Sequence, residues 1–170
     1  MNPVVVQWNP PNPGWIKLNT DGSSRGNPGQ SSYGGIIRNN HGGLICGYMG
    51  RLGYCVSLAS EIWGIMRGLR LIKEQNLNNV IIETDCQAAI MLITVRKVDD
   101  SDPLSSLINA CRKDMMDLRC YMVHVKREGN RCADLLAKIG GYLDQGEYIF
   151  HRDPPLELIS PLIDDAYRRN

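Results

Sequence analysis

Four acidic residues stand where a carboxylate does little for folding but could do chemistry: Asp21, Glu61, Asp85 and Asp134. Asp21 is preceded by an alternating apolar and polar run and followed at once by the small residues of "GSSRGNPG". Carboxylates that converge repel one another and take up protons, and a divalent cation removes that cost. Oxygen ligands of this kind suit Mg²⁺ or Mn²⁺, and two such ions about 4 Å apart serve phosphodiester cleavage.

The predicted elements around these residues favour such convergence. We expect a strand over residues 15–20 that ends at Asp21, and a second strand, "VIIET", that ends at Asp85. Parallel neighbours would place both carboxylates at one sheet edge. Glu61 lies on a helix predicted by apolar spacings of three and four, and Gly64 and Gly68 on its face would let that helix lie close to the sheet.

Asp134 lies one turn into the last predicted helix, "GNRCADLLAKIGG", for which Asn130 is the expected N-cap. The partial positive charge of a helix N-terminus favours an anion there. Each acidic residue alone has a simpler explanation: a turn residue, a solvated helix residue or a partner of the helix dipole. The four together, in this order of elements, favour a metal site.

The element order is three strands, a helix, a strand, further helices, a strand and a helix. Strands separated by helices imply parallel neighbours joined by right-handed crossovers, so we predict an α/β fold with a mixed sheet flanked by helices. We divide the chain into an extended, proline-rich lead-in at 1–14, a domain at 15–141 and a C-terminal extension at 142–170. The extension is expected to pack irregularly or to stay partly loose.

Composition limits the possible functions. The chain has 170 residues, which favours one domain, and a formal net charge of +1, which gives no general attraction to a polyanion. The six cysteines form no CxxC pair, and the start does not resemble a secretory signal. We therefore expect reduced cysteines in an intracellular protein of the nucleus or cytoplasm. No apolar run approaches the roughly 18 residues of a membrane span.

The ordered motifs resemble a known family. "TDGSSRGNPG", the pair Ser60–Glu61 at a helix start, "ETDCQAA" and "GNRCADLLAK" are similar to the type 1 ribonuclease H family, in particular to the reverse transcriptase-like RNase H domains of plant retroelements (retrotransposons) and related plant proteins. The lead-in "WNPPNPGWIKLN" and the tail "DPPLELISPLIDDA" are similar to the same plant group. The resemblance covers nearly the whole chain, and the ordered set is far more specific than any one motif.

The resemblance implies a metal-dependent endonuclease that hydrolyses the RNA strand of RNA/DNA hybrids and leaves 5′-phosphate and 3′-hydroxyl ends. It implies a ribonuclease H-like fold with a five-stranded mixed sheet, three antiparallel strands and then two parallel to the first. Two Mg²⁺ ions, with Mn²⁺ as a substitute, would bind the catalytic residues Asp21, Glu61, Asp85 and Asp134. Gly22 and Ser23 would let the hybrid backbone approach, and Asn27 and Gln87 would reach its minor groove. A turn residue and a polar helix start are the plainer explanations for the last two.

Two departures from the family pattern leave alternatives open. Many relatives carry a histidine on a loop before the last aspartate, whereas His124 lies within a predicted strand. Relatives also carry a basic protrusion and asparagines before the glutamate, which are missing from "VRKVDDSDPLSS" and "YCVSLASE". The chain could therefore be a catalytically weak or inactive nucleic-acid-binding module, aided by a fused or associated reverse transcriptase, or a protein-interaction domain that uses its tail. The basic residues that could follow a phosphate backbone are Arg112, Lys113, Arg119, Lys126, Arg127 and Arg131.

Overall fold

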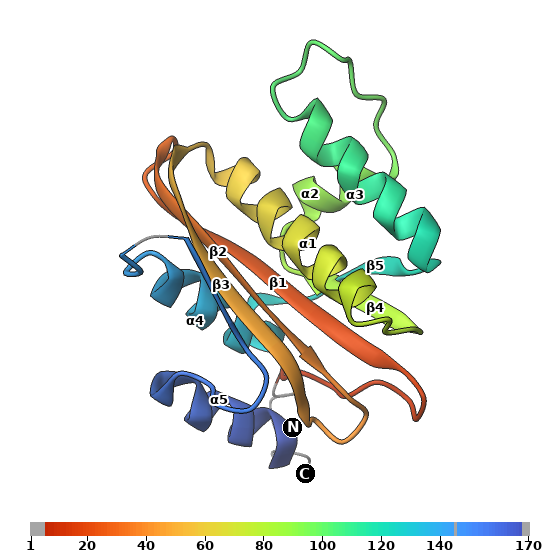
Figure 1. Cartoon of the computed structure of the whole chain (residues 1–170), viewed down its shortest axis with the longest axis vertical. Helices are drawn as coiled ribbons and strands as arrows, with labels where there is room; N and C mark the ends of the chain where they lie inside the picture. Colours follow the sequence, from red (N-terminus) through yellow and green to blue (C-terminus); the bar gives the residue numbers. More distant parts are fainter. Residues whose placement is uncertain (1–5, 145, 168–170) are drawn as a thin grey trace, which may run out of the picture.

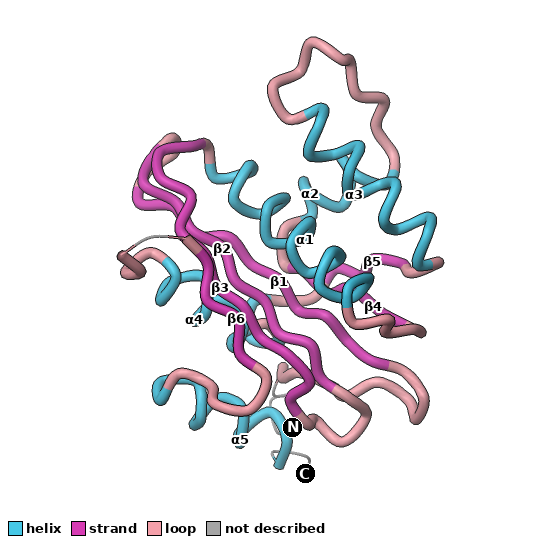
Figure 2. The backbone as a smooth tube through the Cα atoms, viewed as in Figure 1, coloured by secondary structure: helices cyan, strands magenta, loops and turns pink. Residues whose placement is uncertain are grey.

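The computed structural model describes residues 6–144 and 146–167. Its strands are β1 (Ile16–Arg25), β2 (Gly29–Arg38), β3 (Leu44–Cys55), β4 (Val80–Thr84), β5 (Tyr121–His124) and β6 (Glu147–Phe150). Its helices are α1 (Ser57–Glu74), α2 (Gln87–Thr94), α3 (Ser105–Leu118), the 3₁₀ turn η1 (Arg127–Gly129), α4 (Arg131–Gly140) and α5 (Leu156–Tyr167). Figures 1 and 2 show these elements along the chain.

The strands form one mixed sheet in the order β5-β4-β1-β2-β3-β6. β2 is antiparallel to both β1 and β3, whereas β4 is parallel to β1 and β5 is parallel to β4. This arrangement confirms the predicted mixed α/β sheet. The predicted number of five strands is wrong, because β6 pairs antiparallel with β3 and adds a sixth strand at that edge (Figure 2).

Helices cover both faces of the sheet, and each face has its own hydrophobic core. α1 lies across one face with α2 and α3 beside it, and α4 and α5 lie on the other face (Figure 1). Neighbouring residues of β2 pack in different cores, because the side chains of a strand point alternately to the two faces of the sheet. Ile37 packs in the core beneath α1, and Ile36 packs in the core with Leu136 and Leu158.

The close packing of α1 on the sheet depends on its two interior glycines, as expected from the sequence. A Cβ at Gly64 would lie 3.0 Å from the carbonyl oxygen of Asp21, and one at Gly68 would lie 2.6 Å from Leu18 Cδ2 and 2.5 Å from the Tyr48 hydroxyl. The Tyr48 hydroxyl also donates a hydrogen bond of 2.5 Å to the carbonyl oxygen of Gly64. There is therefore no space for side chains at these two positions.

β1 continues past Asp21, which corrects the prediction that this aspartate ends the strand. Gly22, Ser23 and Ser24 stay in register with β2, and the turn comes only at residues 26–28. The small residues after Asp21 are strand residues with backbone partners. Asp21 thus lies in the middle of a long strand, whose paired backbone holds it rigidly on both sides.

Two parts of the C-terminal segment, Glu147–Phe150 and Leu156–Tyr167, form a strand and a helix, which corrects the prediction of an irregular extension. β6 extends the sheet, and α5 packs against α4 through Leu158. Asp165 of α5 forms a 2.7 Å ion pair with Arg38 of β2, and both side chains are almost completely buried. The Arg38 guanidinium also lies 3.8 Å from the ring centre of Trp8 in the lead-in. A buried charge needs such partners, so this pair ties both terminal segments to the sheet.

The lead-in and the cysteines match expectation in part. Residues 6–12 form no helix or strand, whereas residues 1–5 of the predicted lead-in lie outside the described part. All six cysteines are free thiols. Within the described ranges no helix is long and apolar enough to cross a membrane. The division at residues 14 and 141 stays a prediction.

We predict that Gly68→Ala lowers the free energy of unfolding by about 1 to 2 kcal/mol. Overpacking a filled core costs about 1 to 3 kcal/mol, and the better helix propensity of alanine returns up to about 1 kcal/mol. Urea denaturation measures the change. Gly129→Ala is the control, because its new Cβ would meet nothing nearer than 3.5 Å. Equal stability of the two variants would contradict the tight packing of α1.

We predict that Asp165→Asn lowers the free energy of unfolding by about 3 to 5 kcal/mol, because it leaves the Arg38 charge buried without its counterion. The neighbouring Asp164 is a matched control, since it is half-exposed and its ion pair with Arg131 spans 3.5 Å. Asp164→Asn should change stability by less than about 1 kcal/mol. Thermal denaturation of both variants measures the difference, and similar losses would argue against the buried ion pair.

Candidate active site

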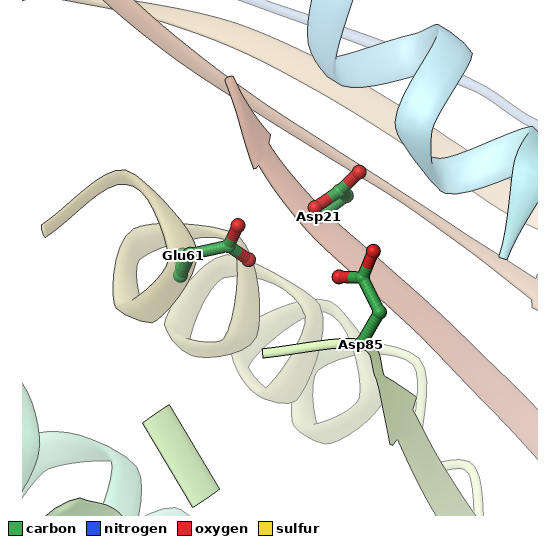
Figure 3. A group of neighbouring side chains, drawn as sticks. All are labelled: Asp21, Glu61 and Asp85. Carbon is green, nitrogen blue, oxygen red and sulfur yellow. The ribbon is translucent and has the colours of Figure 1, made fainter. Parts of the chain in front are cut away.

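Three of the four predicted carboxylates meet at one place. Asp21 comes from the middle of β1, Glu61 from the second turn of α1, and Asp85 directly follows β4 (Figure 3). One carboxylate oxygen from each of the three residues lies within 4.8 Å of the other two. Residues from three separate parts of the chain therefore present oxygen atoms to a single small volume.

Gly22 holds two of these side chains in place. Its backbone N–H donates to Asp21 Oδ1 at 3.0 Å and to Glu61 Oε2 at 3.1 Å. A Cβ at Gly22 would lie 2.6 Å from the backbone nitrogen of Glu61, so a larger residue would push α1 away from β1. Gly22 thus sets the distance between the strand and the helix that carry the first two carboxylates.

The convergence raises the proton affinity of all three groups. Burial, together with the negative charges of Glu61 and Asp85, raises the pKa of Asp21 to about 10. Burial and the charge of Asp85 raise the pKa of Glu61 to about 7, and burial also raises the pKa of Asp85. Two like charges about 5 Å apart repel by about 3 kcal/mol at an effective dielectric constant of about 20. Without a bound cation, this repulsion destabilises the folded protein when all three groups are ionised.

The donor set fits a divalent cation. None of the ion pairs formed by the described residues includes Asp21, Glu61 or Asp85. Carboxylate oxygens are the ligands that Mg²⁺ and Mn²⁺ prefer, and Mg²⁺ needs only a few of them because it retains several waters. Asp21, Glu61 and Asp85 could therefore hold such an ion.

Asp134 lies beside this trio but is bound differently. It sits in the first turn of α4, where its carboxylate accepts from Lys138 at 2.9 Å and lies 4.0 Å from Arg127. Its charge is near enough to contribute to the raised pKa of Asp21. Asp134 is thus at the margin of the site and is neutralised by basic neighbours instead of sharing the central volume.

A buried chain of hydrogen bonds sets the start of α4 against β1. The Asn130 side chain donates to the carbonyl oxygen of Thr20 at 2.9 Å and accepts from Asn19 at 3.0 Å. Asn19 in turn accepts from Arg38 at 3.1 Å, the same arginine that binds Asp165. Asn130 precedes α4 as predicted, but its side chain makes no cap and instead fixes the helix that carries Asp134.

Comparison with known proteins gives the family. A family model described as reverse transcriptase-like matches residues 19–140, which include all four acidic residues. The chain belongs to the reverse transcriptase-like family. A protein of Arabidopsis thaliana that is named as a ribonuclease H protein is 36% identical over 151 residues, or 88% of this chain. The chain spans 24% of the length of that relative.

Solved structures show that this reverse transcriptase-like chain has the ribonuclease H-like fold. RNase H1 from the halophilic archaeon Halobacterium salinarum has a TM-score of 0.68 at 21% identity, over 74% of this chain and 96% of that chain. LC11-RNase H1, isolated from compost and solved in complex with an RNA/DNA hybrid, has a TM-score of 0.66 at 24% identity, over 73% of this chain and 94% of that chain.

The four predicted substrate-binding residues of the reverse transcriptase-like chain lie near the site in different settings. Gly22 and Ser23 are half-buried on β1 next to Asp21. The Asn27 side-chain oxygen accepts from the backbone N–H of Ser57 at 2.9 Å, so it caps the start of α1. Gln87 is exposed at the first position of α2, two residues after Asp85. Their contacts with a hybrid stay predictions.

His124 and the basic residues named from the sequence are scattered over the reverse transcriptase-like fold. His124 is the exposed last residue of β5, as expected for a strand side chain. Arg112 donates to the carbonyl oxygens of Leu92 and Ile93, so it joins α3 to the end of α2. Arg131 pairs with Asp164. Arg112 and Arg131 are therefore engaged by other residues of the chain.

Sequence reasoning missed the residues that support the site. Asn19, Arg38 and Lys138 were given no role from the sequence, and polar residues in a strand normally indicate a solvated face. The available signal was the two polar residues Asn19 and Thr20 directly before Asp21, where a half-buried strand would alternate. Both are fully buried here.

We predict that Asp21→Asn raises the unfolding midpoint in EDTA at neutral pH by about 2 to 4 °C. The raised pKa of Asp21 makes folding take up a proton, and the neutral amide avoids that cost, which is at least about 1 kcal/mol. Added Mn²⁺ should stabilise the wild type, since an ion that binds only the folded state favours it, and this effect should be lost in the variant. Differential scanning fluorimetry gives both values. Asp153→Asn, at an exposed carboxylate, should keep the wild-type response; an unresponsive wild type would argue against the metal site.

Proposed function

We propose that the chain is a divalent metal-dependent endonuclease that hydrolyses the RNA strand of RNA/DNA hybrids and leaves 5′-phosphate and 3′-hydroxyl ends. The observation that carries this proposal is the convergence of Asp21, Glu61 and Asp85 within 4.8 Å in a ribonuclease H-like fold, with no ion pair to a described residue. The similarity to an Arabidopsis protein named as a ribonuclease H protein supports it.

Asp21, Glu61 and Asp85 would hold the metal, with Asp134 completing the set from α4. Bound Mg²⁺ or Mn²⁺ supplies an activated water and stabilises negative charge on the leaving oxygen. The chain itself orients the ligands: the Gly22 N–H holds Asp21 and Glu61, and Asn130 holds the start of α4 against β1. Lys138 balances the charge of Asp134 and fixes its carboxylate beside the site.

The surface beside the carboxylates suits a bulky anionic backbone. Gly22, Ser23 and Ser24 have small side chains or none next to Asp21, so a sugar–phosphate chain could approach β1 without a clash. The exposed Asn27 and Gln87 would supply amide groups to the minor groove of the hybrid. The 2′-hydroxyl, which only the RNA strand carries, would select the strand that is cut.

A reverse transcriptase is the proposed partner, fused or associated, with no membrane involved. The family description and the 24% share of the longer Arabidopsis relative support a module that works next to other domains. The six free thiols support a reducing compartment, the nucleus or cytoplasm.

We predict that the wild type with Mg²⁺ cuts a labelled RNA/DNA hybrid in the RNA strand and that Asp85→Asn lowers the rate by about 100-fold or more, because loss of one electrostatic stabiliser has that effect. Gel analysis of end-labelled strands gives rates and end groups. Asp153→Asn should cut at the wild-type rate. A wild type that binds the hybrid but cuts no faster than Asp85→Asn would support the inactive binding module instead.

A further inference from the structure

A cavity of about 330 Å³ lies outside the carboxylate site, beyond the C-terminal end of α4. β1, β2 and β3 form its floor, and residues at and after the end of α4 form its wall. The lining side chains that matter for its chemistry are Ser23, Arg25, Ser32, Arg51, Lys138 and Tyr142. Arg25 and Lys138 lie within motifs that carry the family resemblance, but the sequence predicts no role for either of them or for Arg51.

The cavity and Asp21 lie on the same face of the sheet. Side chains alternate along a strand, so Asp21, Ser23 and Arg25 point to one face of β1. Ser32 lies opposite Ser23, and Arg51 lies opposite Ser32, so they share that face. Arg25 follows Asp21 by four residues, which is about 13 Å at about 3.3 Å per residue. A nucleic-acid strand whose phosphate lay at Asp21 could therefore reach the cavity within a few nucleotides.

The cavity is positively charged although the whole chain is almost neutral. Arg25, Arg51 and Lys138 line it, and no carboxylate does. Lys138 is paired with Asp134, and the end of α4 contributes a partial charge of about −0.5, which the two arginine charges outweigh. The whole chain has a net charge of only +1, so the positive charge at the cavity is a local feature. This local concentration of charge favours an anion.

The cationic groups are held in position before any ligand arrives. The Arg25 guanidinium lies 4.7 Å from the ring centre of Tyr142. Arg51 donates to the carbonyl oxygens of Leu143 and Asp144 at 3.3 and 3.4 Å. Lys138 is held by Asp134 and so connects the cavity with the carboxylate site. Arginine side chains fixed in this way lose less conformational freedom when they bind a phosphate.

We propose that this cavity binds a backbone phosphate of the RNA strand, a few nucleotides from the linkage at Asp21, with Arg25 and Arg51 as its main contacts. The assignment to the RNA strand rests on the proposed function, since the carboxylates would hold that strand. The bound phosphate aligns the strand along β1, so the cavity acts in substrate binding and not in the chemical step.

The test measures hybrid binding in EDTA, where no cleavage occurs, for the wild type and for Arg25→Gln/Arg51→Gln. The dissociation constant should rise about 10-fold or more in the double variant, and the slope of the salt dependence should fall by about 1 for each phosphate that the variant no longer binds. The control is Lys97→Gln/Arg152→Gln, which removes the same charge at exposed positions that do not line the cavity. It should keep the wild-type slope.

Hybrids with one neutral methylphosphonate linkage then locate the phosphate. One position in the RNA strand should weaken wild-type binding and leave the double variant unaffected, as expected of a coupled pair. Coupling only in the DNA strand, or a loss of slope equal to that of the control, would overturn the proposal. A separate Mg²⁺ cleavage assay of the wild type tests the proposed function. If the protein shows this coupling but does not cut, the proposed activity is refuted and the proposed phosphate binding in the cavity is supported.

Discussion

The close approach of α1 to β1 is the constraint on which the site depends. Gly22, Gly64 and Gly68 carry no side chain at the closest contacts between helix and sheet, so Glu61 reaches the carboxylate of Asp21. The same closeness brings like charges together in a partly dry environment and raises their pKa values. The packing that stabilises the core therefore produces a site that a divalent cation would complete.

A second group of buried polar contacts sets the opposite side of the site. Arg38 lies on the face of the sheet covered by α4, where it binds Asp165, Asn19 and the ring of Trp8. Through Asn19 this contact reaches Asn130 and the start of α4. The lead-in and the C-terminal helix thus contribute to the position of Asp134, although neither contacts the carboxylates directly.

Much of the fold and the chemistry could be predicted from local patterns. Apolar spacing identified the helix of Glu61, and alternation identified the strand that contains His124, because these patterns depend on neighbouring residues. The tail was predicted wrongly because Pro161 lies inside α5 and β6 has only four residues. A short edge strand and an interrupted helix are stabilised by tertiary contacts, here with β3 and Arg38, that no local pattern reveals.

By itself, the sequence determined which groups could act: four carboxylates on separate elements, small residues after Asp21 and glycines on the face of α1. Tertiary structure alone decided that β1 runs on past Asp21, that Asn130 bonds to Asn19 and Thr20, and that Arg25, Arg51 and Lys138 gather in one cavity. These outcomes depend on strand register and on contacts between residues far apart in the chain. Such contacts form only when the whole core packs, so residue type and spacing cannot specify them one segment at a time.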